Sequence, residues 1–95
     1  MRRCGDAGQR GAGLVELLVC NNYSHNVSRH VLDAGDAYAT VWSETLLTDG
    51  LNVPDGVTHS RSGRWIAISN HYDHSVLIYG SVVLAPGSKP AGVLR

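Results

Sequence analysis

The fold of this 95-residue chain is decided by residues 53–79, VPDGVTHSRSGRWIAISNHYDHSVLIY. Apolar runs in this stretch alternate with residues typical of tight turns, a pattern that predicts short strands joined by hairpins. The sequence PDG at 54–56 is a strong turn signal before the first of these strands. Gly63 supplies the positive φ angle that the next hairpin turn requires. The stretch therefore predicts a turn followed by three strands with two tight turns between them.

This stretch also contains one copy of an internal repeat. Residues 70–76, NHYDHSV, lie 49 residues after residues 21–27, NNYSHNV, and both fit the pattern N-x-Y-x-H-x-V. The apolar run at 17–20 falls on residues 66–69 at the same offset. A repeat of about 40–50 residues with several short strands in each copy is typical of β-propeller blades. The sequence therefore predicts that one multi-strand unit occurs twice.

Short strands are expected along most of the remaining chain. Apolar or alternating segments predict strands at 14–21, 26–32, 37–47, 56–60, 65–70 and 75–79, with an extension or further strand at 80–84. A helix at 36–47 remains an alternative for that segment. The expected fold class is all-β, an antiparallel meander of about seven strands.

The expected domain organisation is simple. Residues 1–13 contain several glycines and little apolar surface, so we expect a flexible lead there. Residues 14–95 are expected to form a single β domain, with a first repeat at 14–50 and a second, incomplete repeat at 51–95. A chain of this length fits one small domain with a thin margin of stability.

Composition and charge exclude several classes of partner. Eight Lys and Arg residues balance eight Asp and Glu residues, so the formal net charge is zero. This balance removes the electrostatic reason to expect nucleic acid or an anionic membrane surface as a partner. No apolar stretch approaches the roughly 20 residues of a membrane span, and no signal peptide is recognised. The cytoplasm is therefore the default expectation for a soluble chain.

Three segments of the chain resemble one blade of the six- or seven-bladed β-propellers. They are PDGV at 54–57, SGRWIAISN at 62–70 and HSVLIY at 74–79. The most similar groups are the NHL, YVTN and gluconolactonase-like (SMP-30-like) propellers. The resemblance covers residues 53–79 closely and residues 14–47 more weakly. It implies that the chain forms roughly two four-stranded blades, and that it is a fragment of a larger ring, because closed propellers contain about four to eight blades.

The residues at 70–74 form the candidate metal site. His71, Asp73 and His74 are closely spaced, and zinc sites use His and carboxylate ligands. By resemblance to gluconolactonase-like propellers, Asn70 is a candidate ligand for a divalent cation at a central mouth. The expected cation is zinc or calcium, and no other cofactor is expected. The alternative is that these residues shape a turn, since Asn, Asp and His tolerate turn conformations.

Two further histidines are candidate binding residues. His25 occupies in the first repeat the position of His74 in the second, so it could project from the same rim. His59 lies on the strand that the resemblance makes the innermost one, where it would line a central channel. For His59, the alternative is a channel-wall residue without a chemical role.

Two functions from different classes follow from these observations. The first is a propeller-type repeat fragment that is not an enzyme and binds a protein or a small-molecule ligand. Such a chain is also expected to self-associate through exposed strand edges. The alternative is part of a lactonase-like, metal-dependent hydrolase that further blades complete. The sequence contains neither a G-x-S-x-G nucleophile elbow nor a G-x-x-x-x-G-K-[ST] phosphate loop.

Overall fold

The structure is a computed structural model that describes residues 6–10 and 13–95. The remaining part of the expected lead, residues 1–5 and 11–12, lies outside the described residues. Among the described residues there are two four-stranded sheets and no α-helix. The expected all-β class with antiparallel sheets is confirmed.

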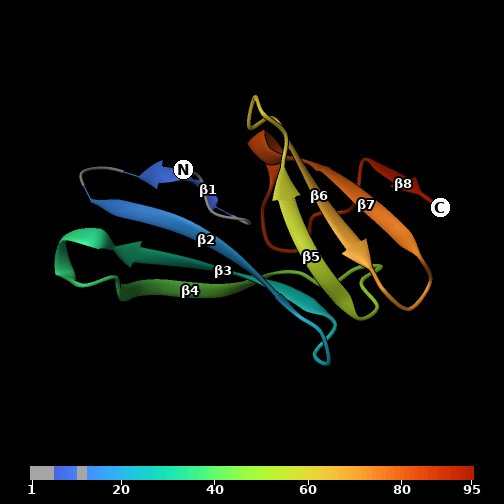
Figure 1. The fold of residues 1–95 in the computed structure, drawn as a ribbon, viewed down its shortest axis with the longest axis horizontal. Helices are drawn as coiled ribbons and strands as arrows, with labels where there is room; N and C mark the ends of the chain where they lie inside the picture. The colour runs from blue at the N-terminus through green and yellow to red at the C-terminus, as the bar shows by residue number, and fades with distance from the viewer. Residues whose placement is uncertain (1–5, 11–12) are drawn as a thin grey trace.

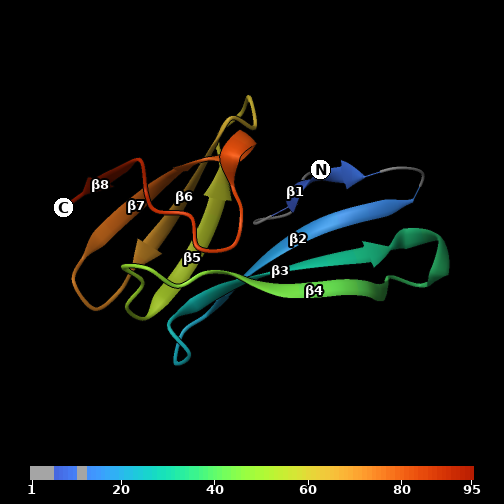
Figure 2. The ribbon, with the colours of Figure 1, turned by 180° about the vertical axis from the view of Figure 1, so that it is seen from behind.

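Both sheets are meanders in which each strand pairs with its neighbours in the sequence (Figures 1 and 2). The first sheet comprises β1 (Asp6–Arg10), β2 (Leu14–Asn21), β3 (Asn26–Asp33) and β4 (Ala39–Leu47). The second comprises β5 (Pro54–His59), β6 (Trp65–Asn70), β7 (Ser75–Gly80) and β8 (Gly92–Leu94). Two short 3-10 turns, η1 (Ala34–Asp36) and η2 (Ser81–Val83), interrupt the connections that follow β3 and β7. All strand pairs are antiparallel.

The sequence repeat is also a structural repeat. In the β2–β3 hairpin, Asn21 pairs with Asn26 and the pairing continues without interruption to the far end of β2. In the β6–β7 hairpin, Asn70 pairs with Ser75 in the same way. Each position of the second hairpin thus lies 49 residues after its counterpart in the first. The two hairpins share one register as well as one sequence pattern.

The turns of these hairpins explain why histidine recurs in the repeat. His25 and His74 are the last residues of their turns, and both have a φ angle of 55°. Few residues other than glycine adopt this left-handed conformation, and histidine is among those enriched there. The repeated histidine is therefore accounted for by the backbone conformation of the turn.

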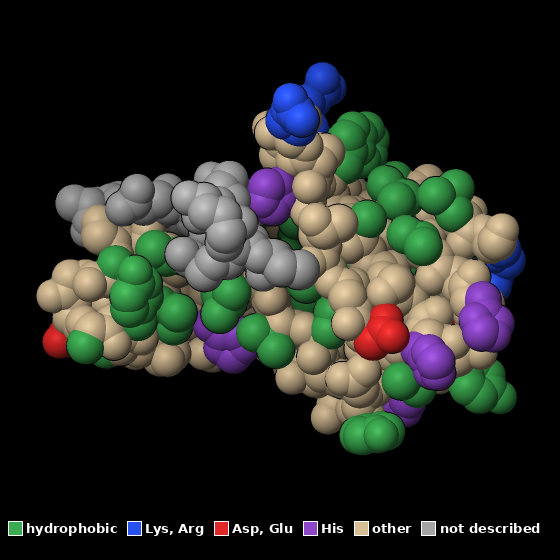
Figure 3. Space-filling view, in the orientation of Figure 1, with side chains coloured by type: hydrophobic (Ala, Val, Ile, Leu, Met, Phe, Trp, Pro, Cys, Tyr) green, Lys and Arg blue, Asp and Glu red, His purple; other side chains and the backbone are tan. Residues whose placement is uncertain are grey.

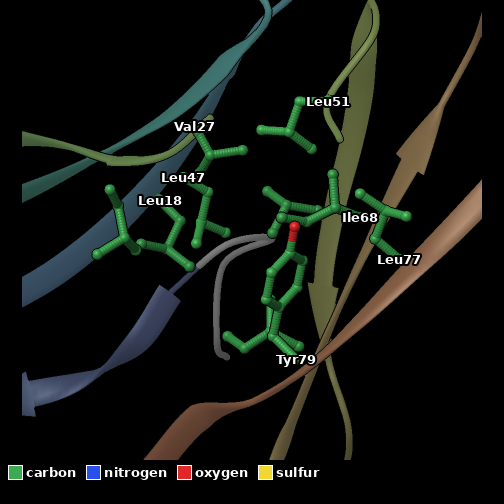
Figure 4. Close-up of a cluster of buried hydrophobic side chains, with 10 residues drawn as sticks. Leu18, Val27, Leu47, Leu51, Ile68, Leu77 and Tyr79 are labelled. Atoms are coloured by element: carbon green, nitrogen blue, oxygen red, sulfur yellow. The ribbon is translucent and has the colours of Figure 1, made fainter. Parts of the chain in front are cut away.

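The main hydrophobic core of the described residues lies between the two sheets. Its buried side chains come from both sheets and from the connection between them (Figure 4). They are Leu18, Val27, Leu46, Leu47, Leu51, Val57, Ile66, Ile68, Leu77 and Tyr79. Strand β5 lies beside β2 where the sheets meet (Figure 1). Burial of this shared layer is the main source of stability, at roughly 25 cal/mol per Å² of apolar surface.

Several local expectations differ from the structure. Residues 6–10 pair with β2, although a flexible lead was expected at 1–13. The helix alternative at 36–47 is wrong, because β4 pairs along its length with β3. The PDG sequence at 54–56 opens β5 instead of preceding it. Proline is tolerated at the first residue of an edge strand, and an irregularity in the pairing falls between Pro54 and Gly56. A last strand, β8, pairs with β7.

Candidate functional site

Asn70, predicted as a metal ligand, is buried and uses both atoms of its amide within the protein. Its side-chain nitrogen donates to the carbonyl oxygen of Gly50 at 2.8 Å and to the hydroxyl of Ser75 at 3.4 Å. Its side-chain oxygen accepts from the backbone N–H of Asn52 at 3.0 Å. Asn70 therefore joins the connection between the sheets to the β6–β7 hairpin.

The other residues of the predicted metal site lie in the exposed β6–β7 turn. The rings of His71 and His74 are 6.4 Å apart between centroids, in an edge-to-face arrangement. Nδ1 of His71 lies 3.9 Å from a carboxylate oxygen of Asp55. The carboxylate of Asp73 accepts from the Ser75 hydroxyl at 2.6 Å and lies 3.5 Å from the Arg95 guanidinium.

These contacts change the pKa of Asp73. The hydrogen bond from Ser75 lowers the pKa of Asp73, burial opposes this effect, and the charge of Arg95 lowers the pKa further. Among the described residues there is no group of three or more His, Cys, Asp or Glu side chains placed to hold a metal ion. The zinc or calcium site stays a prediction.

His25 contacts the connection that leads from the first sheet into β5. Its Nδ1 accepts a hydrogen bond from the backbone N–H of Val53 at 3.0 Å. Val53 has a φ angle of 51°, which is strained for a β-branched residue. The carbonyl oxygen of Val53 accepts from the N–H of His71 at 2.9 Å. His25 therefore links the turn of the first repeat to the start of the second, a contact that needs a neutral Nδ1 acceptor.

His59 lies at the end of β5, and its Nδ1 donates to the carbonyl oxygen of Ser60 at 2.8 Å. This bond assigns the proton of the neutral ring to Nδ1. His59 is one of the residues that line a groove described below, while its direct partner Ile66 lies on the covered face of the second sheet. The structure thus places His25 and His59 on different sheets and does not join them in one site.

The outer side of the second sheet is a largely apolar surface with one exposed aromatic residue, Trp65. Direct cross-strand partners share one face of a sheet, and this face carries Trp65, Ala67, Ser69, Val76 and Ile78, with Thr58 from β5. We call it the open face of the second sheet. Hydrophobic side chains gather over β7 and β8 on this side of the molecule (Figure 3). Trp65 is 46% exposed and Leu94 is 61% exposed.

Two shallow grooves run along this open face and meet at Ala67. One has a volume of about 480 Å³ and is lined by Thr58, His59, Ser60, Trp65, Ala67 and Ile78. The other has a volume of about 360 Å³ and is lined by Gly56, Val57, Thr58, Ala67, Ser69 and Val76. Their walls are mainly apolar and carry no Lys, Arg, Asp or Glu side chain. The sequence signal for this face was the alternation of Trp65, Ala67 and Ser69 with the buried Ile66, Ile68 and Asn70.

The outer side of the first sheet is more polar, and sequence reasoning missed its organisation. We call it the open face of the first sheet; it carries the half-buried Leu17, Val19, Ser28 and His30, and also the buried Val15. The hydroxyl of Ser28 lies 2.8 Å from Nε2 of His30 and 3.1 Å from the side-chain nitrogen of Asn21. Nδ1 of His30 lies 2.8 Å from the hydroxyl of Ser43. These side chains satisfy one another along the sheet.

Three charged residues of β2, β3 and β4 lie on the other side of the first sheet. Arg29 donates through Nε to a carboxylate oxygen of Glu44 at 2.9 Å and lies 3.9 Å from Glu16. The same guanidinium stacks over the ring of Trp42, with 5.6 Å to the ring centroid. On the open face of the first sheet, the residues that β2 and β3 contribute include no Lys, Arg, Asp or Glu.

Comparison of this chain with protein-family models, with curated proteins and with solved structures finds no match. In the described part of the chain, no helix has the length and apolar character needed to cross a membrane.

Proposed function

We propose that the chain is a pair of blade-like repeats of the β-propeller type and that it works as a protein-binding module without catalytic activity. One observation carries the proposal: two four-stranded meanders whose central hairpins share a register at an offset of 49 residues. Repeats of this kind cannot bury their outer faces alone, and stacking against a neighbour covers them. An uncovered repeat face is therefore a natural docking surface.

The form of the open face of the second sheet favours a protein over a small molecule as partner. Pockets for small molecules enclose most of the ligand's surface, whereas these grooves are shallow and lie on an open sheet. The centres of protein interfaces are poor in charge and rich in aromatic residues, and this face has Trp65 but no charged side chain in its grooves. The chemistry and the shape of this face therefore both favour a protein as the partner.

The lactonase-like hydrolase receives no support from the contacts of its expected ligand. Asn70 is 2% exposed and its amide is engaged with Gly50, Asn52 and Ser75. A calcium site needs about six to eight oxygen ligands, and the one side-chain oxygen of Asn70 already accepts a hydrogen bond from Asn52. We therefore retain the binding module alone as the proposed function.

The binding surface can be tested with indole as a stand-in for an apolar group of a partner. We expect millimolar indole to shift the backbone amide resonances of Thr58, Ala67 and Ile78 in a ¹⁵N-labelled sample. Ala67→Leu fills the point where the two grooves meet and should remove these shifts. Ala85→Leu, in an exposed loop, adds the same side chain elsewhere and should leave them unchanged. Indole shifts confined to other parts of the chain would contradict the proposal.

A further inference from the structure

The two repeats differ in which of their faces is covered. In the first sheet, Leu18 and Val27 lie on the face that packs against the second sheet. Their counterparts 49 residues later, Ala67 and Val76, lie on the open face of the second sheet. The stacking within the chain is thus directional, because the same repeat position is fully buried in one copy and only half-buried in the other.

The opposite faces show the reverse relation. Ile66, Ile68 and Tyr79 form part of the covered face of the second sheet. Their counterparts in the first sheet are Leu17, Val19 and His30, which lie on the open face of that sheet. Each open face of the molecule is therefore the repeat equivalent of a face that is already buried inside it.

We propose that the open face of the second sheet binds the open face of the first sheet in another copy of this chain. This inference rests on the proposed function and names the partner. It extends the interface within the chain, since the contact between copies repeats the contact between the two sheets. Such an interface joins different surfaces on the two copies, so a copy bound at one face still offers its other face.

The polar side chains of the first sheet are compatible with burial in this interface. Ser28 and His30 stand where the second sheet has Leu77 and Tyr79, but their polar atoms are bonded to each other, to Asn21 and to Ser43. Buried polar groups cost little when they are hydrogen-bonded. The grooves lack Lys, Arg, Asp and Glu, as do the β2 and β3 residues of the opposing face, and the formal net charge of the chain is zero. No long-range repulsion therefore opposes the approach of two copies.

Two charge substitutions, one on each face, test the proposal by sedimentation velocity. Ala67→Glu places an unpaired carboxylate on the open face of the second sheet, and Val19→Glu places one on the open face of the first. Burial of an unpaired charge is costly, so each variant alone should raise the dissociation constant at least about tenfold over the unaltered chain. Tyr72→Glu, in the exposed β6–β7 turn and on neither face, should associate like the unaltered chain.

Mixing the two variants is the decisive measurement. The mixture retains one unaltered interface. In this interface, the open face of the second sheet on the Val19→Glu chain, around Val76, binds the open face of the first sheet on the Ala67→Glu chain, around His30. We expect a one-to-one heterodimer at concentrations where each variant alone is monomeric. Its formation also shows that both variants are folded, since unfolded chains present neither face.

Three outcomes would overturn the proposal. One is an unaltered chain that stays monomeric at high concentration. A second is a Val19→Glu variant that still dimerises, which would indicate pairing of two identical open faces of the second sheet. A third is association that neither substitution affects, which would indicate pairing through strand edges. The indole titration is carried out on the Val19→Glu variant, because its grooves are not covered by a second copy. Indole binding to this variant would support the proposed function even if the chain does not self-associate as inferred here.

Discussion

Replacing Tyr79 with phenylalanine is expected to stabilise this protein, although Tyr79 is a central residue of the core. Tyr79 is 1% exposed, and its hydroxyl is buried with no hydrogen-bond partner among the described residues. Figure 4 shows the oxygen pointing into the cluster of apolar side chains between the sheets. A buried hydroxyl without a partner costs about 1–3 kcal/mol of stability.

The size of the effect follows from two opposing terms. Tyr79→Phe removes the cost of the unpaired hydroxyl and keeps the ring in place. The void left by one oxygen costs only a few tenths of a kcal/mol, at about 24 cal/mol per Å³. We expect a net gain of about 1 kcal/mol, which for a domain of this size raises the melting temperature by about 4–8 °C.

Urea unfolding followed by the fluorescence of Trp42 and Trp65 measures this gain. Protein concentration must be held fixed, because association stabilises the folded state by mass action. Tyr72→Phe is the matched control, since Tyr72 is 70% exposed and should change stability by less than about 0.5 kcal/mol. A Tyr79→Phe variant that is less stable by 1 kcal/mol or more would show that the hydroxyl has a bonded partner, and the reasoning would fail.

Three other predictions follow from contacts described above. Asn70→Ala should lower the free energy of unfolding by about 2–3 kcal/mol in thermal or urea unfolding, because it leaves Asn52 and Gly50 without their hydrogen-bond partner. Asn21→Ala, at the equivalent half-buried position of the first repeat, should lower it clearly less. His74→Gly should raise the free energy of unfolding by about 0.5–1 kcal/mol, since glycine adopts the φ angle of 55° without strain. His25→Gly should raise it less, because this substitution also removes the hydrogen bond from the N–H of Val53. An equal gain from both glycine substitutions would show that the His25–Val53 bond contributes nothing. Burial, with a smaller contribution from the charge of Asp49, raises the pKa of Tyr79 to about 12. The stability that comes from keeping this phenol neutral is complete below its unfolded value of 10.0 and should fall as pH rises toward 12, a fall that Tyr79→Phe should remove.

The strands with strong apolar patterns could be predicted from the sequence almost to the residue. The expected strands at 14–21 and 65–70 coincide with β2 and β6, because each is an apolar run closed by asparagine before a turn. Two strands were missed at the ends of the described chain. β1 has the sequence DAGQR, which has no alternating apolar pattern, and β8 has only three residues. Their places depend on backbone pairing with β2 and β7, and the sequence pattern does not record such pairing.

The choice of buried face could not be read from the sequence of the first repeat. Residues 17–20 are all apolar, so alternation does not tell whether Leu18 or Leu17 points toward the second sheet. The structure buries Leu18, and this choice depends on the position of the second sheet. The bonds of Asn70 were equally hidden, because they join it to residues near the sheet connection that are far from it in sequence.

Because the core lies between the sheets, a single repeat should not fold by itself, and both repeats are needed to form one folded unit. Either half of the chain, cut within the connection at 48–53, would expose its half of the apolar layer to water and would have no interior to hold its hairpins together. The two halves should unfold in one transition in the intact chain, and separated halves should regain strand structure only when they are mixed. A single break in the connection would thus turn one folded molecule into two chains that need each other to fold.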